Sequence, residues 1–200
     1  MNEKSIFVVG GGPSLKGFDF SKLENLTTIA VNSALVDVPN PNYFITSCPG
    51  YCRTVIKNDF YNKEVHSVMV INPLNQRFFE VKLHLSKFSE WVIPSRYDGQ
   101  LGFTWEQFAT GGNSGFAALQ YVILSGYKNI YLLGIDVRTD KGIHYHHRYP
   151  TMINEVTWWY ECFLQGLDLL KKDTDIKVYS CSNISLLNEV IPFVKFEEIK

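Results

Sequence analysis

The feature that most constrains the fold is a short apolar run that recurs along the chain and ends each time in small polar residues. The runs with their polar ends are Ile6–Val9 with Gly10–Ser14, Thr27–Val31 with Asn32 and Ser33, and Tyr43–Thr46 with Ser47–Tyr51. Consecutive branched and aromatic residues are typical of strands that are buried on both faces, as in a parallel sheet. Because ligands of open α/β sheets bind at the carboxyl ends of the strands, we expect the polar segments to meet in one site.

The first polar segment is unusual because three glycines stand together before a proline and a serine. Its residues are Gly10, Gly11, Gly12, Pro13 and Ser14. Without a Cβ, a glycine lets peptide N–H groups approach a phosphate or a ribose, while Pro13 fixes φ and Ser14 offers a hydroxyl. A tight turn after a strand is the alternative. We favour ligand binding, since three consecutive glycines exceed what a turn requires.

The remaining pattern predicts further strands and two long helices. Strands are expected at Ser67–Ile71, Trp91–Ile93, Asn129–Leu133 and Asp175–Tyr179, and helices at Phe116–Leu124 and Glu155–Lys172. The second helix has apolar residues at helical spacing with charges between them, which is typical of a helix that covers a sheet. The alternation predicts an α/β fold with a mostly parallel central sheet and helices on both faces.

Composition limits the classes of function. The chain has 200 residues and 46% hydrophobic content, which suits one domain over residues 1–200. A net charge of −1 gives no overall attraction to nucleic acid or to an anionic membrane. No apolar stretch reaches the roughly 18 residues of a membrane span, and Met1–Lys4 leads directly into the first strand. We therefore expect a soluble, cytoplasmic protein.

The cysteines do not form a metal-binding or disulfide pattern. Cys48, Cys52, Cys162 and Cys181 lack paired C-x-x-C spacing. In a chain without an export signal, reduced thiols packed as small hydrophobic groups are expected. A zinc site at Cys48 and Cys52 would need ligands from elsewhere in the chain, so no metal is assigned.

A second glycine segment precedes the first long helix. Thr110–Gly115 contains Asn113, Ser114 and Gly115, which would begin the helix and leave N–H groups at its positive dipole end. This arrangement favours an anion, although a Gly-Gly-Asn loop also occurs as a plain turn. Asp136 follows the strand Asn129–Leu133 and is expected at the same edge of the sheet.

Histidines gather after that strand. His146 and His147 stand between Tyr145 and Arg148, in a polar segment of about 138–154 that is expected to form a short lid. Clustered histidines serve as acid or base near neutral pH, bind metals, or lie in a solvated loop. We favour a catalytic or phosphate-facing role for this group, because tyrosine and arginine accompany it.

The order of these motifs resembles the bacterial sialyltransferases of glycosyltransferase family 42. The matching residues are Gly10-x-Gly12-Pro13-Ser14-Leu15-Lys16, Asn32, Pro49-Gly50, Ser114-Gly115, Gly134-Ile135-Asp136 and Ser185-Leu186-Leu187. The resemblance covers residues 5–52, 110–147 and 176–190. It departs from the family at Gly11, where an asparagine is usual, and at Cys48, where an asparagine precedes Pro-Gly.

The resemblance implies a Rossmann-like domain of the GT-A variant type that binds a CMP-linked sugar without metal or other cofactor. Nucleotide contacts would come from Gly10–Ser14, Asn32, Pro49-Gly50, Ser114-Gly115 and Asp136. Ser33 after the second strand and Asn113 at the helix start are added from their positions in the sequence. Tyr145 falls where the family has a phosphate-contacting tyrosine. For the general base, His147 is the first choice and His146 the second. On chemical grounds, Arg148 is a further candidate to stabilise the departing phosphate.

The predicted function is therefore transfer of a sugar from a nucleotide-sugar donor to the hydroxyl of a glycan or other acceptor. Two alternatives remain open. The Gly-Pro-Ser-Leu motif also occurs in related 6-hydroxymethylpterin pyrophosphokinases, which would hold Mg²⁺ and ATP through carboxylates such as Asp136 and Asp140. The third interpretation is a nucleotide-binding protein without catalysis.

Overall fold

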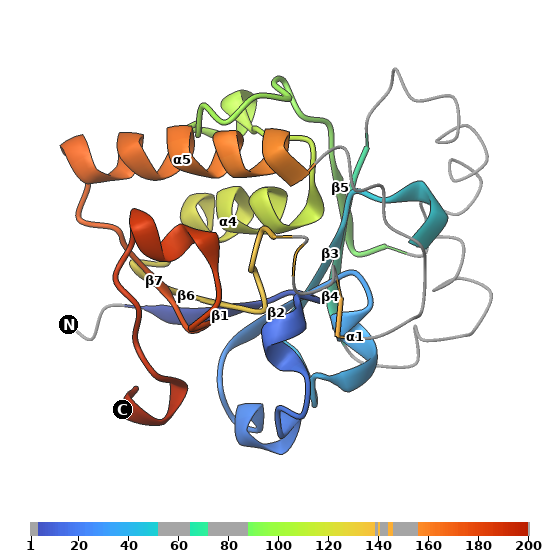
Figure 1. Ribbon diagram of the computed structural model, residues 1–200. Coiled ribbons are helices and arrows are strands. Elements are labelled where there is room, and N and C mark those ends of the chain that lie inside the picture. The colour runs from blue at the N-terminus through green and yellow to red at the C-terminus, as the bar shows by residue number, and fades with distance from the viewer. Residues whose placement is uncertain are drawn as a thin grey trace.

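The structure is a computed structural model that describes residues 4–51, 65–71, 88–138, 140, 144–145 and 156–199. Its centre is a seven-stranded sheet in the order β5-β4-β3-β2-β1-β6-β7 (Figure 1). The strands are β1 Ser5–Val9, β2 Thr28–Val31, β3 Tyr43–Thr46, β4 His66–Val70, β5 Glu90–Val92, β6 Asn129–Leu133 and β7 Lys177–Ser180. Every neighbouring pair is parallel. The predicted α/β class with a parallel sheet is confirmed.

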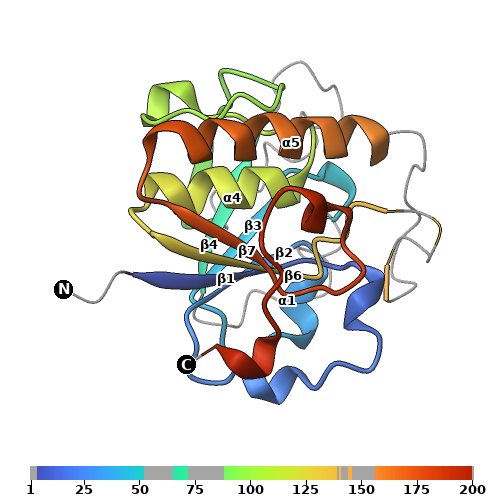
Figure 2. The same ribbon diagram turned by 60° about the vertical axis from the view of Figure 1, so that its left-hand side comes forward.

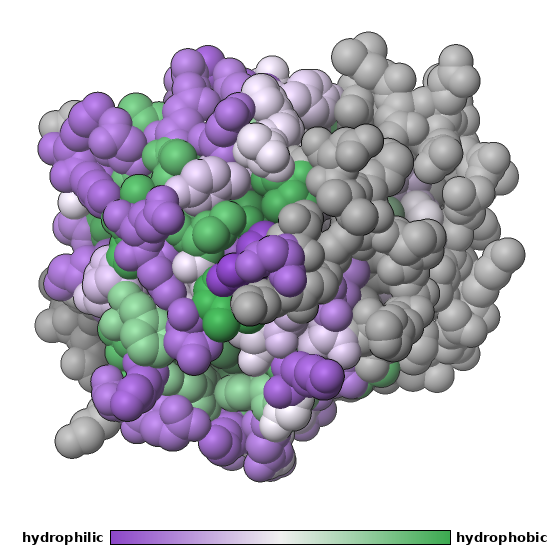
Figure 3. All heavy atoms as spheres, viewed as in Figure 1, coloured by the Kyte–Doolittle hydropathy of each residue, from purple (hydrophilic) through white to green (hydrophobic). Residues whose placement is uncertain are grey.

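The long helices cover one face of the sheet. They are α4 Ser114–Leu124 and α5 Val156–Asp173, and both begin within two residues of the predicted positions. In Figures 1 and 2 they lie one beside the other over the same side of the strands. The outward side of α5 is mostly hydrophilic in Figure 3, as expected for an amphipathic cover helix.

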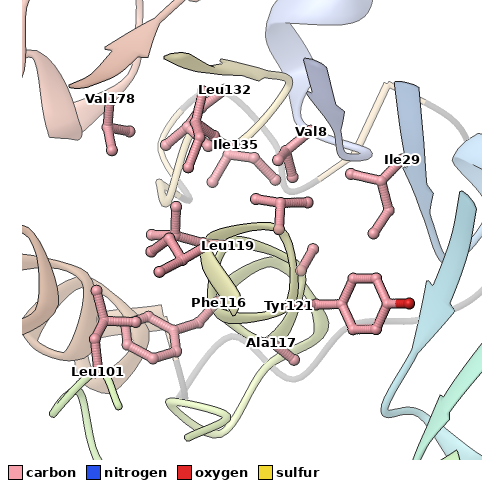
Figure 4. Packing of buried hydrophobic residues seen from close by; sticks show 14 of the residues in the cluster. Val8, Ile29, Leu101, Phe116, Ala117, Leu119, Tyr121, Leu132, Ile135 and Val178 are labelled. Atoms are coloured by element: carbon pink, nitrogen blue, oxygen red, sulfur yellow. The ribbon is translucent and has the colours of Figure 1, made fainter. Parts of the chain in front are cut away.

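The main core lies between α4 and the sheet. Figure 4 shows Val8, Leu132 and Ile135 reaching from the strand side toward Leu119 of α4. Phe116 of α4 packs edge-to-face on Phe163 of α5, with 5.4 Å between ring centroids. Because α4 is buried along almost its whole length, its sequence is mostly apolar on all sides rather than amphipathic.

The opposite face is covered by short elements. They are the helix α1 Ala34–Asp37 and the 3-10 turns η1 Pro13–Leu15, η2 Phe20–Leu23 and η8 Phe196–Glu198. Phe196 from the C-terminal turn packs on Phe7 and on Phe18, each with 5.4 Å between ring centroids. Two further 3-10 turns are η5 Trp105–Gln107, between β5 and α4, and η7 Leu186–Glu189, after β7.

The strand order places a topological switch point beside β1. The chain runs from β1 outward through β2 to β5, and then returns to place β6 on the other side of β1. The connections therefore diverge at the carboxyl ends of β1 and β6, which is where open α/β sheets bind ligands. In the described part of the chain, none of the helices combines the length and the apolar character that crossing a membrane requires.

Candidate functional site

The first glycine segment packs against the end of β6. Gly10 N–H donates to the Leu133 carbonyl and Gly12 N–H to the Gly134 carbonyl, each at 2.8 Å. A Cβ on Gly10 would lie 2.5 Å from Gly134 O, and a Cβ on Gly12 only 2.4 Å from Asp136 Oδ2. These two glycines are required because two backbone segments approach closely, and their N–H groups are used within the protein.

Asp136 holds the serine of this segment. Its side chain accepts the Ser14 N–H at 2.7 Å through Oδ2 and the Ser14 hydroxyl at 2.8 Å through Oδ1. The residue is 2% exposed. Hydrogen bonds to a charged acceptor are stronger than neutral ones, so this pair clamps the segment onto the strand end. The Asp136 carbonyl also accepts Leu186 N–H, which ties in the matched Ser185-Leu186-Leu187 motif.

Asn32 stands at the end of β2 in a left-handed conformation with φ of 52°. Its Oδ1 accepts the hydroxyl of Thr46 at 2.7 Å, and Thr46 Oγ1 in turn accepts Cys48 N–H at 3.1 Å. Thr46 is the last residue of β3, so it links the ends of two neighbouring strands. Ser33, the other predicted residue here, is fully buried before α1.

The N-terminus of α4 is joined to the end of β3. Ser114 Oγ accepts Ser47 N–H at 2.9 Å and shares a second hydrogen bond with Ser47 Oγ at 2.8 Å. Asn113 caps the helix, because its Oδ1 accepts Phe116 N–H at 2.8 Å. The N–H groups of Ser114 and Gly115 have no acceptor among the described residues. The helix thus keeps two donors at its positive dipole end.

Ile135 lies between the two glycine segments. Its Cδ1 would lie 2.5 Å from a Cβ on Gly10 and 3.2 Å from a Cβ on Gly115. The end of β1, the end of β6 and the start of α4 therefore meet around one apolar side chain. The two predicted glycine segments are brought together at the carboxyl edge of the sheet.

The glycine carbonyl at position 11 anchors part of the histidine segment. Gly11 O accepts Tyr145 N–H at 3.0 Å and His144 Nδ1 at 3.2 Å. Burial lowers the pKa of His144 below its ordinary value of 6.5, although the Gly11 hydrogen bond acts in the opposite direction. Since a carbonyl only accepts, Nδ1 carries the proton and the basic lone pair of the neutral ring is on Nε2.

The Tyr145 side chain is partly buried against α1 and η2. Its hydroxyl donates to the Asp37 carboxylate of α1, and its ring packs on Phe20 with 5.6 Å between centroids. Sequence reasoning overlooked both Asp37 and His144 in favour of His146 and His147. His146, His147 and Arg148 lie outside the described residues. The signal for His144 was present, since it begins the same histidine run.

Backbone strain occurs directly after Asp136. Val137 has φ of 50°, a conformation that is costly for a β-branched residue. The next residue, Arg138, is fixed by Asp140 Oδ1 at 2.7 Å from its Nε and by the Ile184 carbonyl. Strained backbone of this kind is common at functional sites, and here it follows the clamp residue.

The remaining predicted residues, Pro49 and Gly50, lie in the segment after β3. Among the described residues, Cys48 Sγ is the one neighbour that a Cβ on Gly50 would have within 4 Å, at 3.9 Å. Cys48 is a free thiol. Within the described ranges, no three histidine, cysteine, aspartate or glutamate side chains are grouped so as to hold a metal.

The unpaired N–H groups at this edge form a set that we call the donor edge. It comprises Gly11 N–H, Asn32 Nδ2, Ser114 N–H and Gly115 N–H, which have no acceptor in the described part of the chain. The oxygens around them are used internally, including Gly11 O, Asn32 Oδ1 and Asp136 Oδ1 and Oδ2. Such an edge complements a ligand rich in hydrogen-bond acceptors, and above all an anionic one.

The comparisons with known proteins find similarity in structure and none in sequence. No family model and no curated protein matches the chain by sequence. Its structure resembles that of the sialyltransferase CstII from Campylobacter jejuni in complex with cytidine-5'-monophosphate. The TM-score is 0.59 and the identity 20%, over 95% of this chain and 84% of CstII.

Two other CstII structures give similar values. The complex with CMP-3FNeuAc has a TM-score of 0.57 and 17% identity, over 96% of this chain and 86% of that one. The complex with a trisaccharide acceptor and CMP has a TM-score of 0.58 and 20% identity, over 95% and 86%. The predicted resemblance to bacterial sialyltransferases is therefore confirmed at the level of the fold.

Proposed function

We propose that the protein is a metal-independent glycosyltransferase of the sialyltransferase type, which moves a sugar from a CMP-linked donor to an acceptor hydroxyl. The observation that carries this proposal is the donor edge at the switch point of a fold shared with CstII. CstII itself is seen with CMP and with a trisaccharide acceptor. A nucleotide offers the phosphate, ribose and base acceptors that the unpaired N–H groups require.

In this proposal the phosphate lies at the N-terminus of α4. Ser114 and Gly115 N–H would donate to it, and the helix dipole would favour its charge. Asn32 would contact the nucleoside, with Pro49 and Gly50 beside it. Gly10, Gly12 and Ser14 would shape the site through packing, because their N–H groups already have protein acceptors. Gly11 N–H remains for the ligand.

The transfer step requires a base for the acceptor hydroxyl. We place it in the run His144–His147, where His144 Nε2 carries the lone pair and the lowered pKa keeps the ring neutral near pH 7. The base takes the hydroxyl proton as the acceptor oxygen bonds to the anomeric carbon. The bond from that carbon to the phosphate oxygen breaks, and CMP leaves with the electron pair. Arg148 is proposed to stabilise the departing phosphate, and Tyr145 would join it by turning its hydroxyl away from Asp37.

The pyrophosphokinase alternative needs carboxylates that are available to Mg²⁺. Both oxygens of Asp136 are engaged by Ser14, and Asp140 is paired with Arg138. A cation at this edge would have to displace those hydrogen bonds. The contacts therefore favour glycosyl transfer over the alternative.

Calorimetric titration with CMP, UMP, GMP and ATP, each with and without EDTA, tests the proposal. We expect CMP to bind and EDTA to have no effect, and CMP-sialic acid to be consumed when a glycan acceptor is added. Binding of ATP that is abolished by EDTA would support the pyrophosphokinase instead. CMP binding without any transfer would support a nucleotide-binding protein that lacks catalysis.

A further inference from the structure

A buried threonine determines which atoms of Asn32 are available to a ligand. Thr46 is 0% exposed, and its hydroxyl oxygen lies 2.7 Å from Asn32 Oδ1 and 3.1 Å from Cys48 N. A hydroxyl has one proton to donate and two lone pairs to accept. Cys48 N–H fills one lone pair, and the single proton is donated to Asn32 Oδ1.

The hydrogen bond from Thr46 sets the orientation of the Asn32 amide. Its oxygen is held against Thr46, and its Nδ2 group is turned away from Thr46 with no acceptor among the described residues. The left-handed backbone of Asn32, with φ of 52°, holds the side chain at the end of β2. The residue therefore presents donors alone to the carboxyl edge of the sheet.

We propose that Thr46 is a positioning residue that makes Asn32 select a hydrogen-bond acceptor on the nucleoside. The inference rests on the proposed function, because it assumes that the ligand at this edge is a cytidine nucleotide. Without the hydroxyl, the amide is free to rotate and to present its oxygen, which repels the acceptor oxygens of a base or ribose. The cost appears in ligand affinity as well as in stability.

Thr28 offers a matched control at the amino end of a neighbouring strand. Thr28, the first residue of β2, is also 0% exposed, but its hydroxyl has no hydrogen-bond partner in the described structure. Replacing either threonine by valine removes a buried hydroxyl at almost unchanged volume. Only at position 46 does the change release Asn32.

The experiment is a double-mutant cycle on CMP binding, measured by calorimetry with Thr46→Val, Asn32→Ala and the two together. We expect each single variant to bind CMP about tenfold more weakly, the loss typical of one good hydrogen bond, and the double variant to bind no more weakly than Asn32→Ala. Thr46→Ser and Thr28→Val should bind CMP as the wild type does.

A purely structural role for Thr46 gives a different result. Thr46→Val would then lower the melting temperature but leave the CMP dissociation constant unchanged, or its effect would add fully to that of Asn32→Ala. Either outcome overturns the inference while leaving the proposed function intact. If the wild type binds no cytidine nucleotide, the proposed function fails and the inference fails with it.

A second pair of variants tests the orientation should Thr46→Val not fold. Asn32→Asp retains an acceptor for the Thr46 hydroxyl but has no donors for the ligand. With uncharged cytidine as the probe, Asn32→Asp should bind at least as weakly as Asn32→Ala. Binding of cytidine by Asn32→Asp at the wild-type level would show that the oxygen, not the N–H group, faces the ligand, and would overturn the inference.

Discussion

The two glycine segments of this protein are similar in sequence and opposite in physical role. In the segment Gly10–Ser14, the N–H groups of Gly10, Gly12 and Ser14 all donate to atoms at the end of β6. In the segment Thr110–Gly115, the last two N–H groups have no acceptor among the described residues. The first segment is therefore a packing joint, and the second faces the proposed ligand.

The reason for glycine also differs between the segments. Gly12 has φ of −65°, which any residue adopts, and it is needed because Asp136 leaves no room for a Cβ. Gly111 and Gly112 have φ of 52° and 68°, where a side chain is strained whatever the space. Changes in the first segment should therefore reduce stability most, and changes in the second should reduce ligand binding most.

The largest expected effect is that of Gly12→Ala. The new Cβ would lie 2.4 Å from Asp136 Oδ2 and 2.7 Å from Gly134 O, so the clamp must open. We expect a loss of about 3 kcal/mol in the free energy of unfolding, measured with urea. Gly17→Ala is the control, since φ of 79° strains it but no atom of the described residues lies within 4 Å of the new Cβ, and it should cost about 1 kcal/mol. Equal costs for the two variants would contradict the packing joint.

Asp136→Asn should have the next largest effect. The amide keeps one acceptor oxygen for the two Ser14 donors, and its NH₂ group meets the other donor. We expect a loss of about 2 kcal/mol in the free energy of unfolding. Ser14→Ala should account for part of this loss, and the double variant should cost less than the sum of the single variants. Full additivity would argue against a direct clamp.

Ser114→Ala tests the second segment. The variant loses the hydroxyl that joins α4 to Ser47, which should cost about 1 kcal/mol of stability and weaken CMP binding about tenfold. Ser125→Ala is the control at the other end of the same helix, where the hydroxyl donates to the Tyr121 carbonyl at 2.8 Å. It should cost similar stability and leave CMP affinity unchanged. A tenfold loss of CMP affinity in both variants would point to general destabilisation of α4.

His144→Gln should have the smallest effect on stability, and it should depend on pH. Because the folded pKa is below 6.5, the unfolded chain binds the proton more readily, so the wild type should lose stability as pH falls from 6.5 to the folded pKa. Above pH 6.5, His144 is neutral in the folded and in the unfolded chain, so it no longer makes the stability depend on pH. Thermal melts between pH 5 and 8 should show a shallower acid-side decline in the variant. An unchanged decline would mean that other groups cause it.

Much of the fold follows from local sequence signals. The apolar runs ending in small polar residues predicted β1, β2, β3 and β6 to within one residue at each end. Helical periodicity predicted α5, because an amphipathic pattern reports one exposed face. The strand β4 was placed one residue late, since His66 does not carry the apolar signal.

The site is harder to predict from the sequence than the fold is, because the residues that form its hydrogen bonds are far apart in the chain. Ser14 and Asp136 are both visible as motif residues, yet their pairing arises only when β1 and β6 become neighbours. Thr46 gives no functional signal at all, since a threonine at a strand end is common. Its role emerges from the contact with Asn32 across the pair β2 and β3.

By itself, the sequence determined that a parallel α/β sheet would carry polar, glycine-rich segments at its carboxyl edge, because strand burial and glycine conformation are local properties. Only the tertiary structure decided what each segment does there. The approach of β6 consumes the N–H groups of Gly10, Gly12 and Ser14, whereas the capped start of α4 leaves those of Ser114 and Gly115 without an acceptor among the described residues. Whether a donor is free depends on which acceptor the fold brings to it, and no local pattern contains that information.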